Sequence, residues 1–429
     1  MEGKWGQPPF SESTVDRASD KLENGGCPHF PAHFPAHFPA ARLSISRIAL
    51  TNFRSYVAAT FEVGPEPVVL LGPNGAGKTN LLEAISLLAP GSGLRRAGYA
   101  ELGRLGGEGD WAVAARVHSR GHDLDIGTGQ RPDARGGRLP GGESPRAGRV
   151  VRIDGETVGA AALADYVDMV WLTPAMDGLF TGPAADRRAF LDRLVLCFDA
   201  GHAPTSARFE RAMRQRNRLL EEGGGRVLFE GLEMQMAEAA VAIAAARLEA
   251  TSALAANSET RRVRNATSPF PWFSLVLEGT LENELRTAPA VDVEDRYRVR
   301  LARDRERDRA ASRTLEGPHR SDLAVVHGPK QMPARLSSTG EQKALLMGLV
   351  LAHAGLIAER REGAPPILLL DEIAAHFDAE RRAALFDEIL ALGAQAWMTG
   401  TDRDAFAALA KRATFAQVED GRIVVVRPA

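Results

Sequence analysis

The chain has 429 residues, of which 44% are hydrophobic and 25% are charged, and its formal net charge is −2. This composition is typical of a soluble globular protein of two or three domains, and the near-neutral balance excludes nucleic-acid binding through the overall field, so that any such contact requires a local basic patch. The sequence has no apolar run long enough to span a membrane, and residues 1–20 lack the apolar core of a signal peptide.

Residues 1–41 differ in composition from the rest of the chain. They contain three tandem copies of His-Phe-Pro-Ala, which begin at His29, His33 and His37. A proline in every fourth position is incompatible with a helix interior, so this segment is predicted to be a disordered N-terminal extension. A histidine-rich metal-binding tail and a start codon assigned too far upstream are the alternatives. We expect the globular part to begin near Leu43.

The first half of the globular part is predicted to be rich in strands. Leu43–Phe53 and Ala58–Val63 form an expected hairpin, and Pro67–Leu71 is a short apolar run typical of a buried strand. Two further strands are predicted, at Trp111–Val117 and Val150–Ile153. Residues 121–149 are rich in Gly, Pro and Arg, and we expect them to form a surface loop between those two strands.

The middle of the chain is predicted to be helical. Ala184–Leu254 is mostly helical in pattern and is alanine-rich from Met236 onward. Glu294–Arg313 mixes arginine densely with acidic residues, which indicates a solvated helix face with i,i+4 ion pairs; a dedicated DNA patch is the alternative. From Leu315 the sequence returns to an alternation of strands and helices.

A complete phosphate-binding loop follows the strand at Pro67–Leu71. Its residues are Gly72, Pro73, Asn74, Gly75, Ala76, Gly77, Lys78 and Thr79, and a helical pattern begins directly after them. The glycines allow the backbone to wrap an anion, and the N-terminus of the helix adds unpaired amides and a positive dipole end. Lys78 is expected to reach the β- and γ-phosphates of ATP, and the Thr79 hydroxyl is expected to ligate Mg²⁺.

Two carboxylates end a second apolar strand, Ile367–Leu370. Asp371 is expected to hold the Mg²⁺ shell, and Glu372 is expected to polarise the attacking water. Such a strand end is common on its own, but together with the loop at Gly72 it completes a nucleotide site. We therefore assign Lys78, Asp371 and Glu372 as the catalytic residues.

A third segment begins the helix before Ala344 and contains Ser337, Ser338, Gly340, Glu341 and Gln342. The N-terminus of a helix binds anions, and the phosphate loop already serves the chain's own nucleotide. The segment is therefore predicted to bind the γ-phosphate held by a second copy, in a dimer with two ATP molecules between the subunits. An ordinary serine-capped helix is the alternative.

Three further positions bear on the site. Asp378 lies where cassette ATPases carry the D-loop, and we count it among the nucleotide-binding residues. The strand at residues 396–401 ends in Thr399 and Thr401, where many such ATPases have a γ-phosphate-sensing histidine, so that role is weakened or different here. No glutamine can be assigned to a Q-loop.

The predicted fold is an α/β P-loop head of the ATP-binding-cassette type with an inserted helical lobe. The phosphate loop and the Ser337 segment are far apart in sequence, so the helices between them form an insertion. The insertion lacks sustained heptads and a central Cys-x-x-Cys, which excludes a long coiled coil and a zinc hook. The expected parts are a disordered segment (1–41), the first part of the ATPase subdomain (42–180), the helical lobe (181–315) and the second part of the ATPase subdomain (316–429).

From Leu43 to its C-terminus the chain resembles the RecF family of bacterial recombination mediators. Besides the nucleotide motifs, the similar segments are Asn52-Phe53-Arg54, Thr173-Pro174, Gly182-Pro183, Arg187-Arg188-Ala189-Phe190-Leu191-Asp192, Gln215-Arg216-Asn217 and Gly317-Pro318-His319-Arg320-Ser321-Asp322-Leu323. The Arg187 and Gly317 segments are much more specific than the nucleotide motifs. Ala175, where the family usually has an acidic residue, and Phe209, near an expected tyrosine, depart from the pattern.

This resemblance implies an ATP-dependent homodimer that binds double-stranded DNA and single-strand/double-strand junctions and hydrolyses ATP slowly. It also implies work with RecO and RecR in loading RecA, in the cytoplasm and in association with the nucleoid. Asn52 and Arg54 are expected near the nucleotide by analogy with related head domains, although Arg54 could simply end a hairpin. The expected DNA contacts are made to phosphates by Arg187, Arg188, Arg214, Arg216 and Arg218.

Two other functions use the same motifs. The chain could be the ATPase subunit of a membrane transporter or another head-domain ATPase, but the inserted lobe and the Gly317 segment disfavour both. It could also be a binding module without ATPase activity, against which Asp371 and Glu372 argue. The two cysteines, Cys27 and Cys197, form no disulfide or metal pattern, which indicates a reducing compartment.

Overall fold

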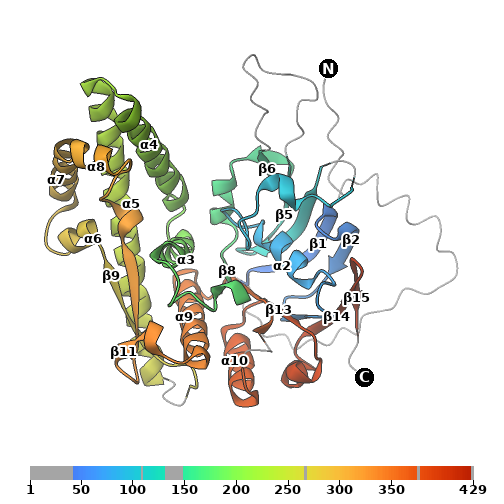
Figure 1. Ribbon diagram of the computed structural model, residues 1–429. Helices are drawn as coiled ribbons and strands as arrows, with labels where there is room; N and C mark the ends of the chain where they lie inside the picture. The colour runs from blue at the N-terminus through green and yellow to red at the C-terminus, as the bar shows by residue number, and fades with distance from the viewer. Residues whose placement is uncertain (1–41, 108–109, 131–147, 265–267, 374–376, 427–429) are drawn as a thin grey trace, which may run out of the picture. The chain divides into compact units, whose positions relative to one another are not determined.

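The computed structural model describes residues 42–107, 110–130, 148–264, 268–373 and 377–426 (Figure 1). The predicted disordered extension at 1–41, with its histidine repeats, lies outside the described residues. The chain forms two compact units. The first takes the residues up to Val167, Glu362–Leu369 and those from Gly393 onward, and the second takes Asp168–Arg361 and Leu370–Leu392. This division differs from the three expected globular segments, because residues 316–361 group with the helical lobe.

The first unit contains an antiparallel sheet in the strand order β2-β1-β4-β5-β6-β7. Its strands are β1 (Ser44–Phe53), β2 (Tyr56–Glu62), β4 (Ala112–Ser119), β5 (His122–Gln130), β6 (Arg149–Ile153) and β7 (Glu156–Val158). The predicted hairpin is confirmed: β1 and β2 pair antiparallel, and a tight turn joins Phe53 to Tyr56. Ile48 and Leu50 on β1 are buried, as the alternation of its side chains requires.

The prediction of a loop over the whole of residues 121–149 was wrong. His122–Gln130 is the strand β5, which pairs with β4 and β6, while residues 131–147 lie outside the described part. Glycines in β5 hid its alternation from the sequence pattern. At Gly129 a Cβ would lie 2.9 Å from the carbonyl oxygen of Trp111, so the close approach of β4 requires the glycine.

A mixed sheet in the first unit carries the phosphate loop. The part of this sheet that belongs to the first unit runs in the order β15-β14-β3-β13-β12, and β3 pairs in parallel with β13 and β14. These strands are β3 (Val68–Leu71), β12 (Ile367–Leu370, whose last residue belongs to the second unit), β13 (Ala396–Gly400), β14 (Thr414–Glu419) and β15 (Arg422–Val425). Every residue of β3 is buried, as predicted for this apolar run. The helix α2 (Lys78–Ser86) follows the loop, and the unit also has the short helices η2 (Tyr99–Leu102), η3 (Ala160–Asp165) and η8 (Asp404–Leu409).

A buried glutamine joins the two sheets of the first unit. The side chain of Gln395 accepts a hydrogen bond from the Ile45 amide at 2.8 Å and donates to the carbonyls of Ile45 and Gly64, each at 2.8 Å. Beside it, the rings of Phe61 and Trp397 meet edge to face, with centroids 6.0 Å apart. Gln395 therefore satisfies backbone groups of β1 and of the segment after β2 that water cannot reach.

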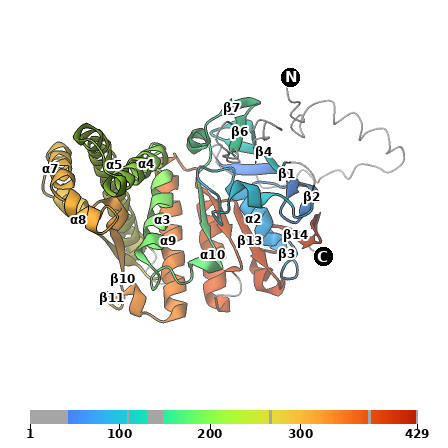
Figure 2. The ribbon, with the colours of Figure 1, turned by 45° about the horizontal axis from the view of Figure 1, so that its top comes forward.

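The second unit is built around a pair of long helices. α4 (His202–Glu222) and α5 (Arg226–Arg264) lie side by side in both ribbon views (Figures 1 and 2), and Gly223 in a left-handed conformation ends α4. The predicted helical character of residues 184–254 is confirmed. The alanine-rich face of α5 makes the core of this lobe, where Ala237, Ala240 and Ala244 are fully buried against side chains of α4 and of α7 (Ala290–Arg303).

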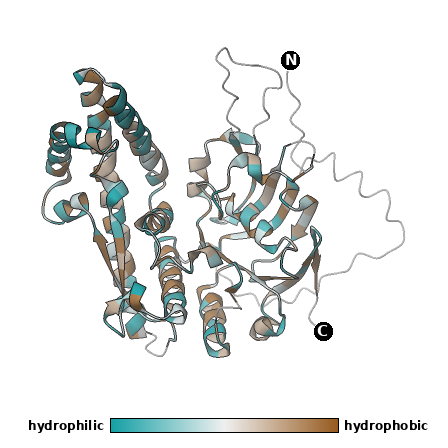
Figure 3. Cartoon of the chain, viewed as in Figure 1, coloured by the Kyte–Doolittle hydropathy of each residue, from teal (hydrophilic) through white to brown (hydrophobic). Residues whose placement is uncertain are grey.

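The remaining elements of the second unit follow one another along the chain. They are β8 (Met169–Leu172), η4 (Pro174–Met176), α3 (Ala184–Leu196), β9 (Phe273–Glu278), α6 (Thr280–Leu285), α8 (Arg305–Ala310), η5 (Pro318–Arg320), β10 (Asp322–His327), β11 (Met332–Pro333), η6 (Ala334–Leu336), α9 (Thr339–Arg360) and α10 (Ala379–Leu392). β9, β10 and β11 form a small antiparallel sheet. α9 is almost entirely buried, whereas α4 and α7 are largely hydrophilic in Figure 3.

The charged stretch at Glu294–Arg313 forms parts of α7 and α8. Its surface pairs lie at i,i+3, not at the predicted i,i+4, as in Arg298 with Asp295 and Arg309 with Glu306. Other members of the stretch contact other parts of the lobe: Asp308, for example, is buried and paired with Arg216. The prediction of a solvated helix face therefore holds for only one side of these helices.

Two helices, α5 and α9, are long and apolar enough to cross a membrane by length and composition alone. In each, half or more of the apolar window is buried inside the structure (50% and 78%), which is typical of core helices in a folded domain. Cys197 is a buried free thiol, and burial raises its pKa. Cys27 lies outside the described residues.

Replacement of Gln395 tests the link between the sheets of the first unit. We expect Gln395→Leu to lower the free energy of unfolding by about 3 kcal/mol, because it leaves the buried amide and carbonyl of Ile45 and the carbonyl of Gly64 without a partner. Urea denaturation measures the change. Gln215→Leu, at an exposed position of α4, is the matched control and should change stability by less than about 0.5 kcal/mol. Equal stabilities of the two variants would contradict this role.

Candidate functional site

The phosphate loop lies between β3 and α2 in the first unit. Its glycines hold conformations that other residues rarely adopt, with φ of +151° at Gly72, +84° at Gly75 and +108° at Gly77. The Nζ of Lys78 donates hydrogen bonds to the carbonyls of Gly72 at 2.7 Å and Pro73 at 2.9 Å. The lysine thus lies across the concave side of its own loop, where its charge can meet a phosphate.

At two of its glycines, Gly72 and Gly77, the loop has no room for a side chain. A Cβ at Gly72 would lie 2.3 Å from the carbonyl oxygen of Val418, and a Cβ at Gly77 would lie 2.7 Å from the Oγ of Ser55. Backbone alone therefore fits between β14 and the β1–β2 turn. A bare backbone whose amides precede a helix is the arrangement that fits a nucleoside triphosphate.

The turn of the β1–β2 hairpin packs on the phosphate loop. The hydroxyl of Tyr56 donates to the Gly77 carbonyl at 2.9 Å, and the Nδ2 of Asn80 donates to the Oγ of Ser55 at 3.0 Å. Tyr56 is fully buried, and burial raises its pKa. Ser55 and Tyr56 were not predicted as site residues. Their position directly after Arg54 was the sign in the sequence that they lie at the site.

Arg54 occupies the hairpin turn and contacts α2. Its guanidinium makes two hydrogen bonds of 2.8 Å to the carboxylate of Glu83, which is buried, and a third to the carbonyl of Glu101. The hydrogen bonds that Arg54 donates to Glu83 raise the pKa of Arg54. Asn52 and Arg54 both have positive φ, 48° and 51°, so the turn that carries them is strained. Arg54 therefore ends the hairpin and also joins it to the helix of the phosphate loop.

The strand-end carboxylates lie in the second unit. Asp371 is buried, and its amide donates a hydrogen bond of 2.9 Å to the carbonyl of Leu172 at the end of β8. Glu372 has a φ of +52°, which is costly for a residue with a side chain and is often found at functional positions. Asp378 is exposed; its carboxylate accepts from the Arg381 amide at 2.8 Å, so it caps the start of α10.

The segment before α9 forms a complete capping box. The Oγ of Ser338 accepts from the amide of Glu341 at 3.4 Å, and the carboxylate of Glu341 accepts from the amide of Ser338 at 3.0 Å. Glu341 also pairs with Lys330, and these bonds lower its pKa to about 2. The prediction that these serines begin a helix is confirmed.

Other residues of this segment, residues 337–342, which we call the signature segment, make fewer hydrogen bonds. The Nε2 of Gln342 donates to the Ser337 carbonyl at 2.8 Å, whereas the buried Oγ of Ser337 has no hydrogen-bond partner among the described residues. Gly340 is half-buried, and a Cβ there would meet only Arg381, at 3.9 Å. One hydroxyl and one open backbone position in this segment therefore stay available to a ligand.

An ion pair missed by the sequence analysis joins the base of α9 to the loop after β8. Lys343 Nζ lies 2.9 Å from the Asp177 carboxylate, and both residues line a small cavity with Thr173 and Asp371. Sequence alone gave no sign of this pair, because the two residues are far apart in the chain. Of the two threonines at the end of β13, Thr399 is fully buried and Thr401 is exposed.

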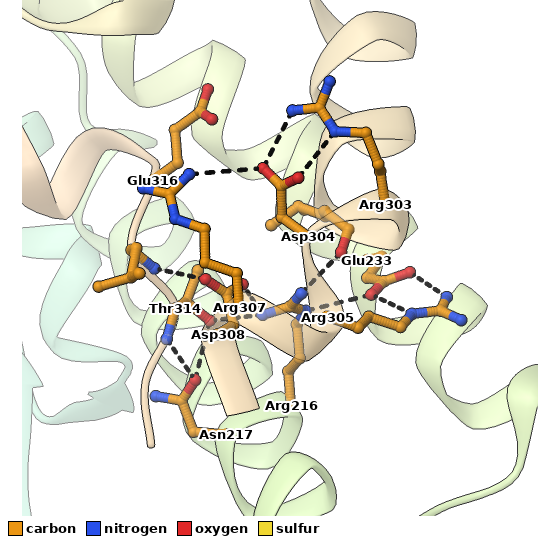
Figure 4. Close-up of polar contacts among 12 residues, drawn as sticks. Arg216, Asn217, Glu233, Arg303, Asp304, Arg305, Arg307, Asp308, Thr314 and Glu316 are labelled. Carbon is orange, nitrogen blue, oxygen red and sulfur yellow. Dashed lines mark hydrogen bonds and ion pairs between the residues drawn. The ribbon is translucent and has the colours of Figure 1, made fainter. Parts of the chain in front are cut away.

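The prediction that Arg216 contacts DNA was wrong. Its side chain is fully buried inside the helical lobe, and its guanidinium lies between the carboxylates of Glu233 at 3.1 Å and Asp308 at 2.7 Å (Figure 4). It also donates to Thr314 Oγ1 and to the Leu301 carbonyl. Spacing in the sequence cannot distinguish such a buried arginine from an exposed one on the same helix.

The other predicted DNA contacts have different environments. Arg187 donates from Nε and one terminal nitrogen to the carboxylate of Asp322, at 2.7 and 2.8 Å, so it serves as an internal pair. Arg188 is half-buried and donates to the Ser321 carbonyl at 2.7 Å. Arg214 is exposed and pairs with Glu210, and Arg218 is exposed.

The predicted site residues are thus divided between the two units. The first unit holds the phosphate loop with Asn52 and Arg54, and the second holds the strand-end carboxylates, the signature segment and Asp378. Among the described residues, no group of three His, Cys, Asp or Glu side chains could hold a metal ion. A threonine hydroxyl and an aspartate carboxylate are nevertheless the oxygen ligands that Mg²⁺ uses beside substrate phosphates.

Solved structures share the fold of this chain. The chain superposes on the recombination mediator protein RecF with ATPrS, with a TM-score of 0.75, over 90% of this chain and 99% of that chain, at 21% identity. The corresponding structure of RecF with ATP gives a TM-score of 0.72 at 20% identity, with the same coverage. Fold and motifs together define an ATPase head of the ATP-binding-cassette type, and the predicted fold class is confirmed.

Sequence comparisons give the family. Residues 44–423 match the family model described as the RecF/RecN/SMC N terminal domain. The chain is 55% identical over 385 residues to the DNA replication and repair protein RecF of Mesorhizobium japonicum, covering 89% of this chain and 98% of the relative. It is 51% identical over 384 residues to the protein of that name in Brucella suis biovar 1, covering 89% and 96%. The chain belongs to the RecF family, as its motifs predicted.

Removal of Arg216 tests its assignment to the core of the lobe. We expect Arg216→Ala to lower the free energy of unfolding by about 3–5 kcal/mol, because it leaves the buried carboxylate of Asp308 without its counter-ion and removes one of the two arginines paired with Glu233. Urea denaturation checks this. Arg214→Ala, at an exposed site two residues away on the same helix, should cost less than about 1 kcal/mol. If Arg216→Ala were as stable as the wild type but bound duplex DNA more weakly, Arg216 would be a DNA contact and not a core residue.

Proposed function

We propose that this protein is an ATP-dependent DNA-binding ATPase of DNA replication and recombinational repair. The observation that carries the proposal is a complete phosphate loop in a chain that aligns with 98% of the length of a DNA replication and repair protein RecF. ATP drives dimerisation on double-stranded DNA, and hydrolysis releases the dimer. A slow, DNA-stimulated turnover suits this role, because the time spent closed on DNA is what the hydrolysis step controls.

Different residues of the chain have different roles in binding and hydrolysing the nucleotide. The loop amides and Lys78 bind the phosphates, and Arg54 holds the hairpin turn against α2 so that Tyr56 and Ser55 stay packed on the loop. Bound Mg²⁺ neutralises charge on the β- and γ-phosphates, and Thr79 and Asp371 are the residues that would hold it. Glu372 is the base that orients and polarises the water.

The second copy of the protein supplies the signature segment. Ser337 has a buried hydroxyl with no hydrogen-bond partner among the described residues, and Gly340 leaves open backbone at the start of α9. In this proposal Ser337, Ser338, Gly340, Glu341 and Gln342 contact the γ-phosphate bound by the partner, and Asp378 lies at the same dimer interface. Two ATP molecules are then enclosed between two chains.

The proposed partners follow from the family. The structures of RecF that share this fold are described within the RecFOR pathway. We infer that this chain binds double-stranded DNA and single-strand/double-strand junctions, and that it works with RecR and RecO to load RecA. We place it in the cytoplasm, associated with the nucleoid.

Replacement of the loop lysine tests the ATP switch. We expect Lys78→Met to abolish ATP-driven dimerisation and to weaken ATP-dependent binding to duplex DNA by roughly tenfold or more, because the phosphates lose their charged partner. Sedimentation measures the dimer, and fluorescence anisotropy measures the DNA affinity, each with and without ATP.

Lys78 also bonds to the carbonyls of its own loop, so folding of the variant has to be checked by circular dichroism and thermal unfolding. If a folded Lys78→Met variant and the wild type bound DNA equally, with and without ATP, the switch would be disproved.

A pair of variants at Ser338 separates the dimer contact from the helix cap. Ser338→Arg should leave ATP binding to the monomer unchanged and abolish the ATP-driven dimer, because a large cation fills the start of α9. Ser338→Ala loses the same cap, at about 1 kcal/mol of stability, without adding bulk. We expect this control to keep the dimer, as measured by sedimentation with ATP. An intact dimer in Ser338→Arg would exclude the arrangement with two enclosed nucleotides.

A further inference from the structure

The Gly317 segment of the family motif is held in place by two arginines from other elements of the second unit. Arg247 of α5 donates to the Pro318 carbonyl at 2.6 Å and to the Ser321 hydroxyl at 2.9 Å. Arg188 of α3 donates to the Ser321 carbonyl at 2.7 Å. The segment therefore has a fixed backbone, with Arg320 at its exposed turn.

The carboxylates that face this region are already neutralised. Asp322 is bound by Arg187 at 2.7 Å, and Asp192 is bound by Arg247 at 2.7 and 2.9 Å. Burial alone would raise the pKa of Asp192, but hydrogen bonds from His202 and Arg247 outweigh it and lower the pKa to about 2. Both aspartates are therefore ionised and paired at neutral pH.

Two guanidinium groups are left without a carboxylate. Arg188 bonds only to a neutral carbonyl, and the side chain of Arg320 has no hydrogen bond or ion pair within the described part of the chain. Asp186 lies on the first turn of α3, but its carboxylate is directed to Gly182, where a Cβ would meet it at 3.5 Å. The surface of the turn thus carries a local excess of positive charge.

The charges of this cluster act on one another. Burial lowers the pKa of Arg188, and the nearby charge of Arg247 lowers it further; Asp322 and Asp192 raise it, and Arg320 makes a smaller lowering contribution. Burial also lowers the pKa of His319, with the charges of Arg320 and Arg188 adding to the effect. Like charges brought this close repel one another, and a bound anion would relieve the repulsion.

We propose that Arg188 and Arg320 form a phosphate-binding site that contacts the backbone of duplex DNA. Guanidinium groups bind phosphate oxygens through two parallel hydrogen bonds, and the fixed turn keeps Arg320 next to Arg188. The site does not distinguish base sequences, because its guanidinium groups bind the charged phosphates. The proposal rests on the proposed DNA-binding function and replaces Arg187 and Arg216, which are used internally, with Arg320.

The test uses Arg320, because Arg188 also supports the backbone of the segment. In Arg320→Gln, we expect the dissociation constant for duplex DNA in the presence of ATP to rise roughly three- to tenfold. The slope of log affinity against log salt should fall in magnitude by about 1, because one phosphate contact is lost. Fluorescence anisotropy over a salt series measures both. Arg422→Gln, an exposed position on β15, removes the same charge elsewhere and should leave the slope unchanged.

The outcomes separate this inference from the proposed function. If the wild type does not bind duplex DNA with ATP, the proposed function fails and the site fails with it. If the wild type binds DNA and Arg320→Gln binds it with the same affinity and salt slope, this inference alone is overturned. A thermal shift in sodium phosphate against sodium chloride at equal ionic strength provides the second arm. Stabilisation by phosphate that Arg320→Gln abolishes, with DNA affinity unchanged, would mean a site for free phosphate and would overturn the assignment to DNA.

Discussion

The rest of the first unit depends on one constraint: β14 and the hairpin turn lie too close to two glycines of the phosphate loop to leave room for side chains there. A side chain at Gly72 would collide with the backbone of β14, and one at Gly77 would collide with the Ser55 hydroxyl of the hairpin turn. The parallel pairing of β3 with β13 and β14 and the packing of Tyr56 on the Gly77 carbonyl follow from this closeness. The strand order and the binding chemistry therefore have a common cause in residues without side chains.

The helical lobe depends instead on large charged residues: buried arginines whose guanidinium groups are hydrogen-bonded. Arg216 and Arg247 each bind carboxylate oxygens and a backbone carbonyl from distant parts of the chain, and Arg247 joins the two motifs that are most specific to the family. Because a buried charge without its partners is costly, such residues fix one arrangement of the helices. The presence of Arg216 in a family motif therefore reports on structure and not on a contact with DNA.

Sequence predicted the elements whose signal is local and failed where the outcome depends on distant partners. The phosphate loop, the β1–β2 hairpin, β12 and the start of α9 were all predicted correctly, since each has a complete pattern within about twenty residues. β5 was missed because its glycines have a low propensity for strands, although they allow β4 to approach closely. Arg216 could not be distinguished from Arg218 by spacing, and the pair of Lys343 with Asp177 joins segments far apart in sequence.

The capping box at Ser338 has a consequence for how tightly two copies could hold one another. The amide of Glu341 is already bonded to the Ser338 hydroxyl, and the Glu341 carboxylate is already bonded to Lys330 and to the Ser338 amide. A phosphate arriving from a partner would exchange with these bonds and would not simply add to them, so the net gain per contact is small. In the proposed dimer, this segment would therefore hold a partner only while the nucleotide is bound, and the lifetime of the contact would depend on the nucleotide more than on the protein surfaces.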